Sequence, residues 1–164
     1  MAEDVVDELA EIIGARLNQL GLSLIKGIVY QIAPDYDPKS GDLLHGEAKH
    51  PFVSITHVQP EQVDSGPSTN VTTFYTRVFT VAIVADKAKV EVAPRRYSAY
   101  RSQAIRALHT YRATGTLDSV DNACIMHALV RPTSPIQQSA WQNMAKFVSV
   151  FDVLFQTEEP TGLT

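Results

Sequence analysis

The longest strand-like stretch of the sequence, VTTFYTRVFTVAIVA at residues 71–85, limits the possible folds more than any other feature. It is rich in β-branched and aromatic residues, which favour strands because their side chains pack well on a pleated surface. No other part of the chain has so strand-like a composition. We therefore interpret this stretch as the central strand of a sheet.

Four further segments are predicted to be strands, because apolar and β-branched residues are concentrated between turn-forming residues. They are residues 27–33, 52–58, 123–131 and 141–156. Pro51 and Pro60 are expected to bound the second of these strands. In the last one, Phe151 and Phe155 belong to an alternating apolar set, and a register break near Ser149 stays open. The predicted loops are residues 59–70, 86–91 and 132–140.

Residues 6–20 have the periodicity of an amphipathic helix. Their apolar side chains recur on one stripe, whereas Asp7, Glu8 and Glu11 are expected to face away from it. Gly21 suits the C-terminal end of such a helix. We expect this helix to pack its apolar stripe on the sheet.

A second helix is expected to begin at Pro94, a residue that suits the first helical position. The residues predicted to share its buried face are Tyr97, Tyr100, Ala104, Leu108 and Tyr111. Arg95 and Arg106 fall on the opposite face, and Arg101 flanks the buried stripe. The helix is therefore predicted to be basic outside and aromatic inside.

Length and composition favour one globular domain. The chain has 164 residues, of which 45% are hydrophobic and 20% charged, as in ordinary packed proteins. We expect a single domain over residues 1–157 and a flexible tail at residues 158–164. The first residues are acidic, unlike a secretory signal, and no apolar run is long enough to span a bilayer. We therefore expect a protein made in the cytoplasm, with no membrane partner.

The segment PDYDPKSGDLLHGE at residues 34–47 combines acidic side chains, a histidine and turn-forming residues. Asp35 and Asp37 have the spacing of the first two ligands of a calcium loop, but Lys39 stands at the third ligand position. Gly41 also lies one place after the position where such a loop requires glycine. We favour a solvated loop that docks a partner, and ion binding stays open.

No other motif predicts chemistry. The five histidines are scattered, and Cys124, the only cysteine, lies within an apolar predicted strand, where an inert thiol is expected. The sequence contains no GxSxG, Walker-type or GxGxxG motif. We therefore expect no catalytic residue, no metal site, no cofactor and no enzymatic activity.

Charge is unevenly distributed along the chain. Residues 1–50 carry four basic and nine acidic side chains, whereas residues 71–112 carry eight basic and two acidic ones. Such segregation is typical of complementary faces that meet on neighbouring copies, or of a basic face that binds phosphates. The alternative without a partner is a helix face whose charges are simply solvated. Candidate residues for a subunit or partner interface are Asp35, Asp37, Asp42, Arg77, Lys87, Lys89, Arg95 and Arg96.

The order of predicted elements carries a resemblance to a known family. An acidic amphipathic helix precedes two strands separated by a long loop, a strand ending FTVAIVA, the segment APRRYSAYRSQAIRAL, and closing strands ending FVSVFDVLFQ. This order resembles the tail-terminator, or tail completion, proteins of long-tailed bacteriophages, including relatives that join the tail tube to the neck. The resemblance extends over residues 3–157.

The resemblance implies an α+β fold in which two main helices flank a mostly antiparallel sheet. It also implies a structural virion protein that forms a hexameric ring, caps the tail tube and binds the head-side connector or stopper protein. DNA would only pass through the ring, and the protein would be found in the tail or neck after assembly in the host cytoplasm. The alternatives are a head-completion or neck adaptor on the portal side, a small nucleic-acid-binding protein, or a small enzyme.

Overall fold

The computed structural model describes residues 5–20, 27–31, 51–64, 72–109, 119–120 and 123–160. Its elements in the first half of the chain are α1 (Val5–Asn18), β1 (Gly27–Gln31), β2 (Phe52–Asp64) and β3 (Thr72–Asp86). They are followed by α2 (Lys87–Val92), α3 (Pro94–His109), β4 (Ser119–Val120), β5 (Ala123–Ser134), α4 (Gln138–Asn143) and β6 (Lys146–Pro160).

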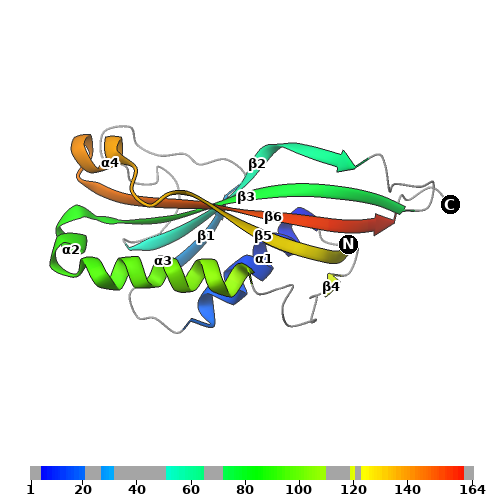
Figure 1. Ribbon diagram of the computed structural model, residues 1–164, viewed down its shortest axis with the longest axis horizontal. Helices are drawn as coiled ribbons and strands as arrows, with labels where there is room; N and C mark the ends of the chain where they lie inside the picture. The colour runs from blue at the N-terminus through cyan, green and yellow to red at the C-terminus, as the bar shows by residue number, and fades with distance from the viewer. Residues whose placement is uncertain are drawn as a thin grey trace.

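The strands form one six-stranded sheet in the order β1-β2-β3-β6-β5-β4. β1 is parallel to β2, and every other neighbouring pair is antiparallel. The two long helices, α1 and α3, lie on the same side of this sheet, and α2 and α4 lie together near one end of it (Figure 1). This arrangement confirms the expected fold class, an α+β protein with a mostly antiparallel sheet flanked by two main helices.

The long strand predicted from residues 71–85 is confirmed as a central strand. β3 pairs with β2 on one side and with β6 on the other. Its register with β6 is continuous from Thr72, opposite Pro160, to Asp86, opposite Lys146. The register break considered near Ser149 does not occur between these two strands, because Ser149 keeps its place opposite Ile83. The register of β6 with β5 does shift close by, between Pro132, opposite Phe151, and Ser134, opposite Val150.

The main core lies between the sheet and the two long helices. Alternate residues of β3 and β6, among them Phe79, Val81, Phe151 and Phe155, are fully buried on the helix-facing side. The rings of Phe79 and Phe155 meet edge to face, with centroids 5.8 Å apart. Burial of such side chains stabilises the fold by about 1.5–3 kcal/mol each. A smaller cluster on the opposite face is formed by Phe52, Ala82, Val84 and Val150.

The buried stripe of α3 is confirmed for Tyr97, Tyr100, Ala104 and Leu108, and Tyr111 lies outside the described residues. Arg95 and Arg106 are exposed, as predicted. Arg101 is half-buried, and it joins α3 to β6 because its guanidinium donates to Ser149 Oγ at 2.9 Å and to the Val150 carbonyl at 2.8 Å.

The stripe of α1 is also confirmed, with Leu9, Ile13 and Leu17 buried and with Asp7 and Glu11 exposed. Glu8 corrects the prediction, since its residue is only 7% exposed. Position 8 precedes Leu9 on the helix and lies close enough to the apolar stripe to be covered.

Several element boundaries differ from the prediction. β2 continues through Pro60 to Asp64, with its register to β3 shifted between Val58 and Gln62. A bulge of this kind lets a strand continue past a residue that cannot donate to the ladder. The predicted loop at 86–91 is mostly α2, and β5 extends to Ser134, into the predicted loop at 132–140. Helix α4 spans the end of that loop and the first residues of the strand predicted over 141–156, which begins instead at Lys146.

The C-terminal boundary is corrected as well. The tail was expected to begin at residue 158, but Glu158, Glu159 and Pro160 continue β6 and pair with Phe74, Thr73 and Thr72. Pairing with a central strand satisfies the backbone groups that a tail would expose to water. No helix among the described residues is long and apolar enough to cross a bilayer.

Candidate functional site

The eight interface residues predicted from the sequence fall into three groups. Asp35, Asp37 and Asp42, with the rest of the 34–47 segment, lie outside the described residues. Arg77 is buried. Lys87, Lys89, Arg95 and Arg96 lie together on α2 and at the start of α3.

Arg77 has an intramolecular role in place of the exposed one that was expected. Its residue is 7% exposed, and its guanidinium forms an ion pair with Glu159 on the neighbouring strand β6. Thr157 Oγ1 donates to the same carboxylate at 2.7 Å, and the Arg77 guanidinium stacks over the Tyr75 ring at 4.3 Å. A buried charge that is paired in this way holds β3 to β6 and leaves little surface for a partner.

Helix α2, which leads into α3, is held by contacts with α4 and with the start of β6. The backbone N–H of Lys87 donates to the Ala145 carbonyl at 3.0 Å, and Val90 is buried. The Lys87 ammonium lies 4.8 Å from the centre of the Trp141 ring. Asp86, just before α2, pairs with Lys146 at 2.5 Å. These contacts fix the orientation of α2 and therefore of the residues that follow Lys87 on it.

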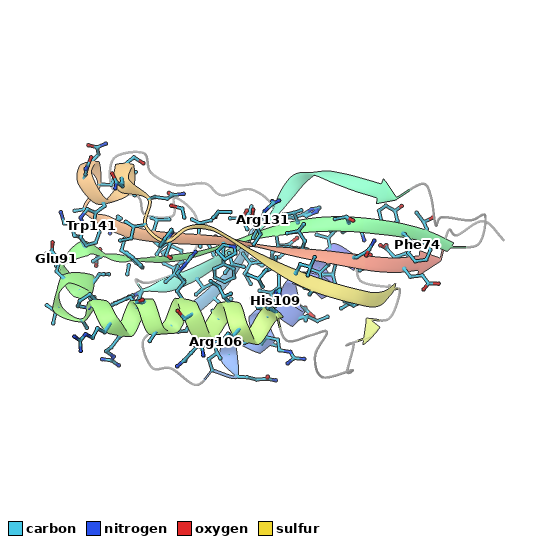
Figure 2. The ribbon with its side chains drawn as sticks, in the orientation of Figure 1. Phe74, Glu91, Arg106, His109, Arg131 and Trp141 are labelled. Carbon is cyan, nitrogen blue, oxygen red and sulfur yellow. The ribbon has the colours of Figure 1, made fainter. Side chains whose placement is uncertain are left out.

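The outer surface of α2 and the start of α3 is mostly basic with an apolar centre, and Glu91 is its one exposed acid among the residues from Lys87 to Arg96. Val92 is 86% exposed, more than any other large hydrophobic side chain among the described residues. Around it in the sequence, Lys89, Arg95 and Arg96 are all exposed. We call Lys89, Val92, Arg95 and Arg96 the basic corner. It lies at the end of the molecule marked by Glu91 in Figure 2.

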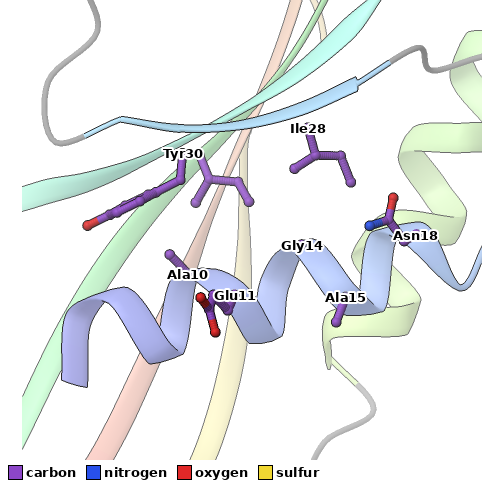
Figure 3. Close-up of a pocket in the computed structure, with 8 residues that line it drawn as sticks. Ala10, Glu11, Gly14, Ala15, Asn18, Ile28 and Tyr30 are labelled. Atoms are coloured by element: carbon purple, nitrogen blue, oxygen red, sulfur yellow. The ribbon is translucent and has the colours of Figure 1, made fainter. Parts of the chain in front are cut away.

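A second surface feature lies between α1 and the edge strand β1. It is an open groove of about 340 Å³, and Ile28 and Tyr30 point into it from β1 (Figure 3). We call it the α1–β1 groove, and its lining residues are Ala10, Glu11, Gly14, Ala15, Asn18, Ile28, Tyr30 and Ile55.

Small residues on α1 create this groove. Gly14 has no side chain, and a Cβ placed there would lie 3.8 Å from Ile28 Cγ2, at ordinary contact distance. Ala10 and Ala15 add little volume, so the helix leaves a space that larger side chains would fill. The walls of the groove are therefore mainly apolar.

The outer edge of the groove is acidic. Glu11 lines the groove, and Asp7 lies one helical turn before it on the same side of α1. Both carboxylates are exposed, whereas Arg16, the one basic residue of α1, is half-buried. The groove thus combines an apolar floor with negative charge at its edge.

Two histidines and one core tyrosine among the described residues make contacts within the fold. The described residues contain no group of three or more histidine, cysteine, aspartate or glutamate side chains placed to hold a metal ion. His109 Nδ1 accepts a hydrogen bond from the Val130 backbone N–H at 3.1 Å, and the His57 ring lies 5.1 Å from that of Phe79. Burial raises the pKa of Tyr100 to about 12, which keeps this core phenol neutral.

The sequence predicted the basic residues of the basic corner, but it predicted neither the α1–β1 groove nor the exposure of Val92. Asp7 and Glu11 were expected only to face solvent, and the groove beside them was not predicted. The pairing of β1 with β2 and the approach of α1 create it, so no local pattern signals it. The exposure of Val92 was also missed, because Val90 and Val92 are alike in sequence and differ only in the direction that the short helix α2 gives them.

No family model matches the sequence, and no curated protein is significantly similar to it.

Proposed function

We propose that this chain is a structural protein of a phage particle that assembles into a hexameric ring, caps the tail tube and joins it to the head-side connector. The observation that carries the proposal is the presence of two unlike exposed surfaces on one subunit. They are the basic corner on α2 and α3 and the acidic edge of the α1–β1 groove. A closed ring of identical subunits requires unlike patches, because each copy meets the next through two different surfaces.

The order of the elements supports the same proposal. A helix, three strands, a helix and closing strands, built into a mostly antiparallel sheet, is the arrangement implied by the resemblance to tail-terminator proteins. The far ends of β3 and β6 extend beyond α3 (Figure 1). Such an extension offers surface for axial contacts with a tail tube or a connector.

The test is the state and the location of the purified protein. Sedimentation and electron microscopy should show six-membered rings, and the rings should bind the ends of tail tubes purified from the phage that encodes the chain. Attachment to portal-bearing heads instead of tubes would replace the proposal with a neck adaptor on the portal side. A protein that remains monomeric and absent from virus particles would overturn it.

Nucleic-acid binding is a second candidate function, favoured by the composition of α3. This helix has no acidic residue, and Arg95, Arg96 and Arg106 are exposed on it. Contacts with phosphates would make duplex affinity fall steeply as salt rises. Fluorescence anisotropy with duplex DNA at low and high salt tests this candidate, and undetectable binding at low salt rules it out.

A further inference from the structure

We infer that the basic corner of one subunit docks into the α1–β1 groove of the next copy of this chain, with Val92 inserted between α1 and β1. This inference rests on the proposed ring and names the surfaces that would close it. The occupant is a second copy because the chain itself carries both complementary halves, on α2 and α3 at one end of the sheet and on α1 and β1 elsewhere (Figures 1 and 3).

The apolar parts of the two surfaces match. Val92 is followed by the half-buried Ala93 and the exposed Pro94, so the corner has a short apolar segment at its surface. The groove is walled by Ile28 and Ile55 and has a floor opened by Gly14. Burial of an 86% exposed valine in such a groove removes apolar surface from water, which is favourable without any specific bond.

The charges around the apolar contact match as well. Three exposed basic residues, Lys89, Arg95 and Arg96, lie near Val92 in the sequence, against one exposed acid, Glu91, so the corner keeps a positive balance. Glu11 lines one side of the groove, Asp7 lies one helical turn before it on α1, and both carboxylates are exposed. Two arginines at the positive end of α3 repel that helix end and each other, and a neighbouring acidic surface relieves this repulsion. Opposite charges around an apolar centre also fix the orientation of docking.

The decisive experiment exchanges the charges of the two surfaces. One variant carries Arg95→Glu and Arg96→Glu, and the other carries Asp7→Lys and Glu11→Lys. Each alone places like charges at every contact, so the concentration needed for assembly should rise by about tenfold or more. An equimolar mixture should assemble again, because an alternating ring then has opposite charges at every contact. All four positions are exposed, and circular dichroism of each variant checks that the subunit remains folded.

A disulfide cross-link tests the position of Val92. With Cys124 replaced by serine, Val92→Cys and Ala15→Cys on one chain should give a ladder of covalent oligomers under oxidising conditions, because Ala15 is exposed and lines the groove. The matched control pairs Val92→Cys with Gln103→Cys, an exposed position on α3 away from the groove, and should give at most traces.

The outcomes separate this inference from the proposed function. Rings that form on tail tubes, yet resist both charge reversals and give no cross-link at Ala15, overturn the docking and leave the ring function in place. If assembly is restored in the mixture but the assembled rings never bind tail tubes, the docking is supported and the tail function is overturned. A chain that stays monomeric at high concentration overturns both.

Discussion

At the scale of single residues, the buried pair of Arg77 and Glu159 joins the side chains of the neighbouring strands β3 and β6. Both side chains are about one-tenth exposed or less, and Thr157 completes their hydrogen bonding. Removal of one partner leaves a buried charge without its counterion, which is more costly than replacement of both.

We therefore predict that Arg77→Met and Glu159→Gln each lower the free energy of unfolding by about 3 kcal/mol or more. The double variant Arg77→Met with Glu159→Gln should lose less than the sum of the two single losses. Urea denaturation followed by circular dichroism measures all three. Strictly additive losses would show that the pair is not coupled.

Ala145 is a second residue with a clear consequence. It has a φ of 51°, in the left-handed region that glycine adopts more readily, between α4 and β6. Ala145→Gly should raise the free energy of unfolding by about 0.5–1 kcal/mol. The matched control is Ala99→Gly at an exposed helical position of α3, which should lower it by about 1 kcal/mol. Equal losses at both positions in thermal melting would contradict the argument.

Tyr100 gives a prediction about alkaline pH. Its side chain is buried, and its pKa is raised from 10.0 to about 12 because burial disfavours the charged phenolate. The unfolded chain therefore loses this proton first, so stability is complete below about pH 10 and falls between about pH 10 and 12. Burial also raises the pKa of Tyr97, although the nearby Arg96 opposes the shift.

The free energy of unfolding of Tyr100→Phe should accordingly fall less over this range than that of the original chain. Denaturation curves at several pH values from neutral to alkaline, with phenolate absorbance recorded in parallel, measure the difference. Parallel pH profiles for the two proteins would show that Tyr100 ionises equally easily in both states.

At the scale of elements, β6 forms more strand pairing than the sequence predicted, because it continues to Pro160. The C-terminal residues of β6 pair with the first residues of β3 and contribute Glu159 to the buried ion pair. At the opposite end of the sheet, the short helices α2 and α4 turn the chain. There the Phe147 ring meets the rings of Tyr97 and Trp141 edge to face.

We predict that a chain ending at Thr157 is less stable than Glu159→Gln, because it loses three residues of strand pairing in addition to the carboxylate. The expected loss in free energy of unfolding exceeds about 3 kcal/mol. A chain ending at Pro160 keeps the whole of β6 and is the matched control. Equal melting temperatures for the chains ending at Thr157 and Pro160 would contradict this account of β6.

At the scale of the whole molecule, association between copies should depend on salt. Exposed charges around the basic corner and the α1–β1 groove interact over a screening length of about 10 Å at 0.1 M salt and about 3 Å at 1 M. We predict that the concentration for half-assembly, measured by sedimentation velocity, rises several-fold over this range while circular dichroism of the subunit is unchanged. Association that strengthens with salt would indicate a purely apolar interface.

Much of the secondary structure was determined by the sequence alone. The β-branched run in β3, the apolar stripe of α1 and the tyrosine face of α3 identify their elements, because each depends on a period within one segment. The basic character of the 71–112 segment also follows from sequence, since charge is a property of the residues themselves.

The tertiary structure decided what those residues can reach. It buried Arg77 against Glu159, eighty-two positions away, extended β6 to Pro160, and placed α1 beside β1 so that small residues open a groove. The same packing left Val92 exposed while it buried Val90 two positions earlier. These outcomes depend on contacts between segments that are distant in the chain, and such contacts leave no local period from which they could be predicted.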